Sequence, residues 1–350
     1  MHVTLHDVCR KTGFSTATVS RALNGSPRVA EDTRNLVVEA AKELGYQPSH
    51  AARMLKLKRA DMIAVIFPEI DSGFFTEVLR GIDETASEHS YHLMTAFTHG
   101  PDDERNLISR FVWERRVDAL ILMNLTLPEA YLRDLSLWEH PIVLMDRPVR
   151  MDNMYSVSID NRNGARELTN HLIEHGYRRI AFISGPKGTY DADERLAAFR
   201  ETMGENGLEV NDRLIWPGQF TEASGRDAVA RWLDADNPLP DAIFAANDAM
   251  AIGALSLLRE RGFRVPRDTA LVGFDDIDTA AHLGLTTVHV PMRRMGSIAA
   301  QLAVDQISQN KSLTSYRLPV ACAVRSSCGC PTGVSSDPAA ADKAKREALT

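Results

Sequence analysis

The stretch GFSTATVSRALNG, residues 13–25, decides the fold of the N-terminal part of the chain. Ser15 can cap a helix over residues 16–23, because its hydroxyl can accept a hydrogen bond from a free backbone N–H of the first turn. Val19 and Leu23 lie one turn apart on one face of that helix, and an Asn-Gly pair ends it. We therefore predict a short helix with an apolar inner face and a polar outer face.

Two further helices flank this stretch. Thr4 can cap a short helix with Val8 and Cys9 on one face, and Gly13 ends it. Apolar residues recur with helical spacing over residues 33–44, which predicts the clearest amphipathic helix of this part of the chain. Together the three helices predict a compact all-α unit.

The basic residues concentrate near the N-terminus. The whole chain of 350 residues has a net charge of −7, which by itself argues against binding to nucleic acid. Residues 1–60 nevertheless hold ten Lys and Arg against five Asp and Glu, a net of +5. Residues 61–350 hold 30 basic against 42 acidic residues, a net of −12. A basic head before an acidic body points to a nucleic-acid-binding module.

Two short helices joined by a Gly-containing turn and braced by a third match the helix-turn-helix, whose second helix enters the major groove of DNA. Thr16, Ala17 and Arg21 would project outward and reach base edges, and Arg21 suits the paired O6 and N7 acceptors of guanine. Other polar residues of this stretch suit phosphates; they are Ser15, Thr18, Ser20 and Asn24. A plain three-helix bundle with a solvated basic face is the alternative.

From residue 62 onward, apolar strands alternate with amphipathic segments of helical length. The predicted strands cover residues 62–67, 92–97, 117–123, 141–146, 155–159, 179–184, 242–246, 270–274 and 286–290. This alternation predicts an α/β fold of doubly wound parallel sheets with right-handed crossovers. Because about 270 residues are too many for one such core, we expect two lobes.

The organisation along the chain follows from these patterns. We expect a helix-turn-helix domain over residues 1–48, a linker over residues 49–59, and a two-lobed domain over residues 60–330. Residues 331–350 are small, polar and without periodicity, which predicts a disordered tail.

Several function classes find no support in the sequence. The longest apolar runs are about five residues, too short to cross a membrane, and the N-terminus lacks the pattern of a signal peptide, so we expect a cytoplasmic protein. Phosphate-binding, zinc-protease and nucleophile-elbow motifs are absent, so we expect neither an enzyme nor a cofactor. Cys328 and Cys330 suggest a metal or redox site. Zinc sites, however, usually combine a Cys-x2-4-Cys pair with further ligands, and no such ligands lie nearby in the sequence. We therefore expect no metal site.

The order of residues in the head closely resembles the lactose-repressor/galactose-repressor (LacI/GalR) family of transcriptional regulators. The matching runs are VTLHDV at residues 3–8, GFSTATVSRALN at residues 13–24, Val29, Thr33-Arg34 and LGYQP at residues 44–48. Cys9 departs from the family's usual Ala, and we expect it to be a small core residue.

The resemblance gives the linker over residues 49–59 a role. In the LacI/GalR family this segment is a hinge that folds on the operator, where two symmetry-related leucines open a central base step through the minor groove. By position, that leucine would be Leu55. A plain linker with one exposed leucine is the alternative.

The resemblance continues through residues 60–330, because the ligand domain of the family is similar to the periplasmic sugar-binding proteins of the ribose type. Positions that line the sugar cleft in such proteins carry aromatic, charged or amide side chains here. They are Phe74, Phe75, Asp146, Arg147, Arg195, Phe220, Asn247, Asp275 and His289. Ser72-Gly73 replaces an Asn-Pro pair, which puts one polar contact of the family's site in doubt. His289 replaces a Gln, which implies a different sugar or anomer. Asp248 is expected to cap the helix that follows Asn247.

The resemblance therefore implies a DNA-binding transcriptional regulator, a repressor of sugar-utilisation genes. A homodimer would read a pseudo-palindromic operator, with a tetramer as an alternative. A mono- or disaccharide or a sugar phosphate between the lobes would control operator affinity. The alternatives are an effector that acts as a corepressor, or a non-sugar metabolite such as a nucleobase. A periplasmic solute-binding protein would share the body without the head, and a sugar-processing enzyme would need an acid/base pair across the cleft.

Overall fold

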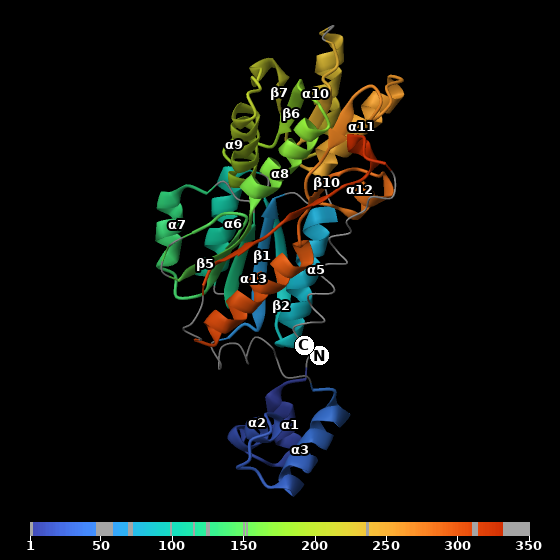
Figure 1. Cartoon of the computed structure of the whole chain (residues 1–350). Helices are drawn as coiled ribbons and strands as arrows, with labels where there is room; N and C mark the ends of the chain where they lie inside the picture. The colour runs from blue at the N-terminus through green and yellow to red at the C-terminus, as the bar shows by residue number, and fades with distance from the viewer. Residues whose placement is uncertain are drawn as a thin grey trace. The chain divides into compact units, whose positions relative to one another are not determined.

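The computed structural model describes most of the chain, which divides into two compact units, Met1–Ala60 and Asp61–Thr350 (Figure 1). The described residues are 3–46, 59–68, 73–98, 100–114, 116–123, 127–149, 151, 153–235, 238–309 and 314–331. Leu55 with nearly all of the predicted hinge, and all but the first residue of the predicted tail, lie outside the described residues.

The first unit contains the three predicted helices. They are α1 (Leu5–Thr12), α2 (Thr16–Leu23) and α3 (Glu31–Leu44). The Asp7 carboxylate accepts hydrogen bonds from the backbone N–H and the hydroxyl of Thr4, and Ser15 caps α2 by accepting from the N–H of Thr18. The local capping chemistry of the sequence thus sets where these helices begin.

A small apolar core holds the three helices together. Val8 from α1, Val19 and Ala22 from α2, and Val37 and Ala41 from α3 are all buried in one cluster. Cys9 packs at the edge of this cluster as a partly buried residue, in the core position expected of it. The predicted inner face of α2 is therefore confirmed.

The second unit begins with a lobe built on a six-stranded parallel sheet. Its strands are β1 (Met62–Pro68), β2 (His92–Thr98), β3 (Ala119–Met123), β4 (Ile142–Met145), β5 (Met154–Ile159) and β11 (Tyr316–Leu318), in the order β11-β5-β4-β3-β1-β2. Its helices are α5 (Gly73–Glu88), α6 (Pro101–Trp113), α7 (Glu129–Ser136) and α13 (Met292–Ile307). Figure 1 shows α5 and α13 lying side by side against the sheet.

Both faces of this sheet are buried, because successive side chains of β1 point to opposite faces and pack into two different clusters. Val65 points to the cluster formed with Val78 of α5, whereas Ala64 points to the cluster formed with Ile108 of α6 and Leu132 of α7. A parallel sheet covered by helices on both faces explains why its strands read as continuous apolar runs.

A second lobe is built on a four-stranded parallel sheet. Its strands are β6 (Ile180–Ser184), β7 (Ile215–Pro217), β8 (Ala242–Ala245) and β9 (Ala270–Val272), in the order β7-β6-β8-β9. Its helices are α8 (Asn161–Glu174), α9 (Tyr190–Glu205), α10 (Glu222–Asp234), α11 (Asp248–Glu260) and α12 (Asp278–His282). The predicted α/β class with two lobes is confirmed.

The structure departs from the prediction in three short strands. β7, β11 and β12 (Ala321–Ala323) were not predicted. Each has only three residues, β11 is mostly exposed, and β7 and β12 are apolar but only partly buried. β12 pairs antiparallel with β10 (Thr287–His289), in a two-stranded sheet that the all-parallel prediction did not include. Within the described residues, no helix is long and apolar enough to cross a membrane.

Candidate functional site

The outer face of α2 carries the residues predicted to contact bases. Thr16, Ala17 and Arg21 are exposed, while Val19 and Ala22 on the opposite face are buried. The helix therefore presents a short polar surface with one guanidinium, as base readout in a major groove requires.

The residues predicted to contact phosphates surround this face, and some already hold the helix ends. Ser15 and Asn24 are exposed, and Thr18 and Ser20 are partly buried. The hydroxyl oxygens of Ser15 and Thr18 lie 2.9 Å apart, and the amide of Asn24 donates to the carbonyl of Ser20 at 2.6 Å. These side chains order the two ends of α2 in addition to any contact with DNA.

The second unit holds a buried charged cluster centred on Arg195 of α9. Its guanidinium donates from Nε to Oδ1 of Asn161 at 2.8 Å and from Nη1 to the carbonyl of Ala246 at 2.6 Å. Asn161 in turn donates to Asp191 at 2.8 Å. Nη1 of Arg195 also lies 3.6 Å from Oδ1 of Asp275. Two hydrogen bonds and one ion pair thus fix the plane of the guanidinium.

Three carboxyl groups surround this one guanidinium. Burial raises the pKa of Asp146 well above its usual value, and the charges of Asp191 and Asp275 raise it further. Burial also raises the pKa of Asp275 well above its usual value and that of Asp191 to about 6, although Arg195 opposes both shifts. Asp146 follows β4 in the first lobe, whereas the other residues belong to the second lobe, so both lobes supply the cluster. Acidic groups outnumber the single cation, which suits a ligand that donates hydrogen bonds.

Several residues of this cluster hold a left-handed backbone that non-glycine residues rarely adopt. The φ angle is 66° at Asp146, 61° at Phe220 and 121° at Asp275. Such strain is typical of functional sites, where surrounding contacts over-determine the conformation. The ring of Phe220 lies against Gly185, where an added Cβ would come within 2.2 Å of the ring, and its centroid is 5.9 Å from Cζ of Arg195.

A cavity of about 370 Å³ adjoins the cluster and is lined by both lobes. Asp146 and Arg147 line it from the first lobe, and Tyr190 and Asp191 line it from the second. Arg147 is held by a hydrogen bond from Nη1 to the carbonyl of Leu127 at 2.6 Å. A volume of this size can accommodate a small polar metabolite.

The amide of Asn247 corrects one detail of the sequence interpretation. Asn247, not Asp248, caps α11, because its Oδ1 accepts from the N–H of Met250 at 3.0 Å while its Nδ2 donates to the carbonyl of Phe220 at 3.0 Å. Asp248 is buried inside the first turn and accepts from Thr287 and from the N–H of Ile277. Asn247 therefore positions Phe220 from the edge of the cluster.

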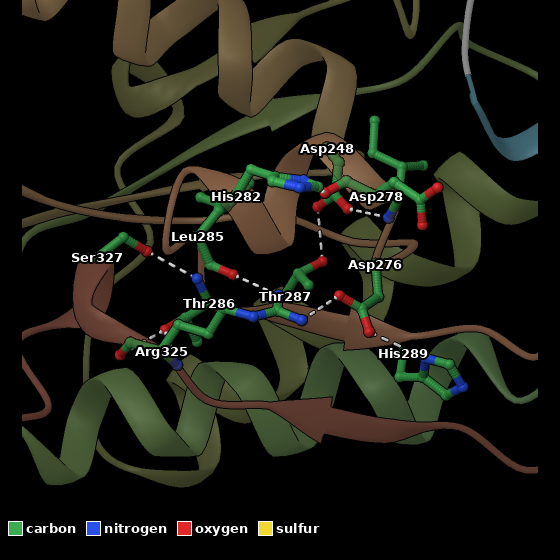
Figure 2. Close-up of polar contacts among 11 residues, drawn as sticks. Asp248, Asp276, Asp278, His282, Leu285, Thr286, Thr287, His289, Arg325 and Ser327 are labelled. Carbon is green, nitrogen blue, oxygen red and sulfur yellow. Dashed lines mark hydrogen bonds and ion pairs between the residues drawn. The ribbon is translucent and has the colours of Figure 1, made fainter. Parts of the chain in front are cut away.

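His289 takes part in a separate polar network, shown in Figure 2. Its Nδ1 lies 2.9 Å from Oδ2 of Asp276, whose other oxygen accepts from Arg325 at 2.6 Å. Burial alone would raise the pKa of Asp276, but the hydrogen bonds from His289 and Arg325 hold it below its usual value. The backbone of His289 forms a β-bridge with that of Asp275, so this network is connected to the charged cluster through Asp275.

Phe74 and Phe75, at the start of α5, form an aromatic group of their own. Their ring centroids are 5.5 Å apart, and Phe75 lies 5.8 Å from Phe67 of β1, both in edge-to-face contacts. Phe74 is buried and Phe75 is partly buried. No described contact joins either ring to Arg195 or Asp146.

Sequence reasoning missed three members of the charged cluster. Asn161 follows a strand end, the same signal that pointed to Asp146, and Asp191 lies one helical turn before Arg195. The ring centroid of Phe274 lies 3.8 Å from Cζ of Arg195, so the ring stacks on the guanidinium. In the sequence, Phe274 is indistinguishable from any other buried residue at a strand end.

The comparisons with known proteins agree with this arrangement of a three-helix head and a two-lobed body. The family described as "Bacterial regulatory proteins, lacI family" matches residues 4–49, and a "Periplasmic binding protein-like domain" matches residues 169–328. Catabolite control protein A of Priestia megaterium is 34% identical over 313 residues, which cover 88% of this chain and 94% of the relative. The transcriptional regulator CelR of Thermobifida fusca is 37% identical over 314 residues, covering 87% of this chain and 92% of CelR.

Solved structures of regulators show the same fold. A complex of the transcriptional regulator CelR with cellobiose aligns with a TM-score of 0.70 at 33% identity, covering 93% of this chain and 100% of the other. A lac repressor dimer bound to operator and the anti-inducer ONPF aligns with a TM-score of 0.82 at 25% identity, covering 94% and 99%.

Head and body together define a DNA-binding transcription regulator. The chain belongs to the LacI family of bacterial regulatory proteins.

Proposed function

We propose that this protein is a homodimeric repressor of sugar-utilisation genes whose operator affinity is set by a small neutral polyhydroxy compound between the two lobes. Two copies of α2 would enter successive major grooves of a pseudo-palindromic operator. The observation that carries the proposal is the buried Arg195–Asp275 pair, which interacts electrostatically with Asp146 of the opposite lobe, a residue that lines the cavity.

The chemistry of the cluster favours a ligand with several hydroxyls. Each hydroxyl can donate to a carboxylate and accept from the guanidinium, which matches the mixture of Asp146, Asp275 and Arg195. Phe220 offers a ring face for the C–H side of a sugar. The structure of CelR with cellobiose is a precedent for a saccharide in a related regulator.

The charge of the cluster narrows the ligand class. Three carboxyl groups face one guanidinium, whose Nε and Nη1 already donate to Asn161 and to the carbonyl of Ala246, so the cluster offers a phosphate few free cationic donors. A neutral mono- or disaccharide therefore fits better than a sugar phosphate. A nucleobase lacks the row of hydroxyls that the carboxylates would hold.

The coupling to DNA follows from the ligand's contacts. An effector held by Asp146 in one lobe and Arg195 in the other would draw the lobes together, shift the paired first lobes and separate the hinges. It can release DNA only if it binds the DNA-free arrangement more tightly than the DNA-bound one. An effector with the opposite preference would act as a corepressor.

Two experiments test the proposal. Operator selection from random duplexes with the purified full-length protein should enrich a palindrome, and failure to enrich one removes the DNA-binding claim. A thermal-shift screen should then find a neutral saccharide that raises the melting temperature, because binding to the folded state stabilises it. Stabilisation by sugar phosphates or nucleobases alone would contradict the ligand class, and turnover of the bound compound would indicate an enzyme.

A further inference from the structure

A second cluster of polar side chains lies far from the charged cluster, at the C-terminal end of α8. His171 lies in the last turn of α8, His175 is its C-cap residue, and their ring centroids are 4.7 Å apart. Cys328, at the end of the short helix η2 (Ser326–Cys328), and Cys330 face them. One ligand atom from each of the four residues lies within 4.8 Å of all the others.

The distances in this cluster match those of a tetrahedral metal site. Nε2 of His171 lies 3.2 Å from Sγ of Cys328 and 3.8 Å from Sγ of Cys330, and Nε2 of His175 lies 3.2 Å from Sγ of Cys330. Zinc bonds of about 2.3 Å to sulfur and about 2.0 Å to nitrogen place those two atoms about 3.5 Å apart in a tetrahedron. The observed separations bracket that value.

The surrounding contacts hold both cysteines in place. The backbone at Gly329 has a φ of 101°, and an added Cβ there would approach the hydroxyl of Tyr177 to 3.0 Å. That hydroxyl donates to the carbonyl of Cys328 at 3.0 Å, and the hydroxyl of Thr286 lies 3.1 Å from the sulfur of Cys328. Partners of this kind orient metal ligands and tune their basicity.

The segment that carries the cysteines is itself anchored to Thr286, the residue before β10, as Figure 2 shows. Ser327 accepts from the N–H of Thr286 at 2.8 Å, and the N–H of Arg325 donates to the hydroxyl of Thr286 at 2.8 Å. Little rearrangement is therefore needed to present both sulfurs to an ion.

Burial and charge also fit a dication. Cys328 is fully buried and His175 is exposed, so the cluster reaches from the core to the surface and an ion can enter from solvent. Two thiolates would neutralise the two charges of the metal, while the imidazoles bind uncharged. Both cysteines are free thiols, so neither is consumed in a disulfide.

We propose that His171, His175, Cys328 and Cys330 form a structural zinc site that fastens the end of the two-lobed domain to α8. Four protein ligands fill the tetrahedron and leave no open position for a reacting water, which distinguishes a structural from a catalytic site. Binding releases the two thiol protons to solvent. Such a site was not anticipated from the sequence, because the two histidines lie more than 150 residues from the cysteines in the chain.

Cobalt substitution tests this site in the full-length protein without a histidine tag. After chelation and titration with Co²⁺, we expect one equivalent to bind, with thiolate-to-cobalt charge-transfer absorption and the intense visible bands of tetrahedral Co²⁺. One equivalent of Zn²⁺ should abolish both. Metal analysis of the protein as purified should find about one zinc per chain.

The test variants replace one ligand each, at the two positions of the cluster that lie nearest the surface. Cys330→Ser and His175→Asn, at partly buried and exposed positions, should each weaken Co²⁺ binding at least about 100-fold. Cys322→Ser and His282→Asn are matched controls outside the cluster and should bind as the unaltered protein does. Circular dichroism checks that each variant is folded. If Cys330→Ser does not fold, Co²⁺ binding by His175→Asn decides between the presence and absence of the site. Absence of the charge-transfer band, or unaltered binding by His175→Asn, would overturn the proposal.

Discussion

Nη1 of Arg195 lies 3.6 Å from Oδ1 of Asp275, and both side chains are almost completely buried. The pair is held by neighbours, since Asn161 orients the guanidinium from α8 and Phe274 stacks beneath it. A charged pair kept out of water costs desolvation energy, which good geometry and further hydrogen bonds must offset. Asn161 connects the pair to Asp191, which lines the inter-lobe cavity, and the proposed function assigns the pair to ligand binding.

Arg195→Ala should abolish effector binding while leaving DNA binding intact. We expect effector affinity to fall at least about tenfold, because a buried guanidinium that donates to hydroxyls is lost. Operator affinity should change by less than about twofold, a shift too small to count as a lost contact. Calorimetry with the effector and anisotropy with the operator measure the two. Arg200→Ala, on the same helix but exposed and paired with Asp212, is the control and should bind effector normally. Equal losses in both variants would contradict the assignment.

Asp275→Ala tests the same pair from the other side. It should also weaken effector binding, and it removes the carboxyl group paired with Arg195 while Asp146 and Asp191 remain nearby. The loss of stability should therefore be smaller than the about 3–5 kcal/mol that follows when a buried charge loses all compensation. Chemical denaturation measures that loss. An Asp275→Ala protein that binds effector as tightly as the unaltered chain would remove Asp275 from the site.

Arg21→Ala should reduce sequence-specific binding more than non-specific binding. A bidentate contact to guanine contributes about 1–3 kcal/mol of discrimination, so operator affinity should fall about 5- to 150-fold. Lys42→Ala, an exposed basic residue of α3, controls for loss of one positive charge. Competition between selected and scrambled duplexes reports the difference. If both variants lose the same affinity for both duplexes, Arg21 contributes charge and not base readout.

Leu55→Ala should weaken operator binding and leave effector affinity unchanged. The expectation rests on the resemblance of the linker to the family's hinge, because Leu55 lies outside the described residues. A leucine inserted at a base step bends DNA and widens the contact surface, so its removal should shorten the lifetime of the complex. Dissociation kinetics of a labelled operator provide the measurement. Full operator affinity in Leu55→Ala would show that Leu55 does not insert at a base step.

Asp191 makes stability depend on pH in an identifiable direction. Burial raises its pKa from 3.8 to about 6, so the folded protein binds a proton more readily than the unfolded chain. This group therefore destabilises the fold at pH 7, and the effect is relieved as the pH falls through 6. Relative to Asp191→Asn, the unaltered protein should gain about 1 kcal/mol between pH 7 and pH 5. Denaturation of both proteins at the two pH values measures the gain. A constant difference between them would contradict the raised pKa.

Local chemistry made the head predictable from sequence. α2 covers the predicted residues 16–23, because Ser15 and the Asn-Gly pair define its ends within one turn. All nine predicted strands are present, although β9 and β10 have only three residues. β11 carries no apolar run and β12 consists of small residues, so their pairing with β5 and β10 was not visible in the sequence.

Contacts between distant segments limited the prediction of the sites. The family resemblance predicted Asp146, Arg195 and Asp275, but the three-dimensional arrangement was needed to add Asn161 and Asp191. The pairing of His289 with Asp276 was equally invisible in the sequence.

The central claim is that the ligand in the inter-lobe cavity and the operator on α2 influence each other. The most direct measurement is fluorescence anisotropy of a labelled, selected operator, titrated with the protein with and without a saturating amount of the saccharide found by thermal shift. We predict that the saccharide changes operator affinity at least about tenfold, and that the operator changes saccharide affinity by the same factor, as linkage requires. Identical operator affinity with and without the bound saccharide would contradict the account.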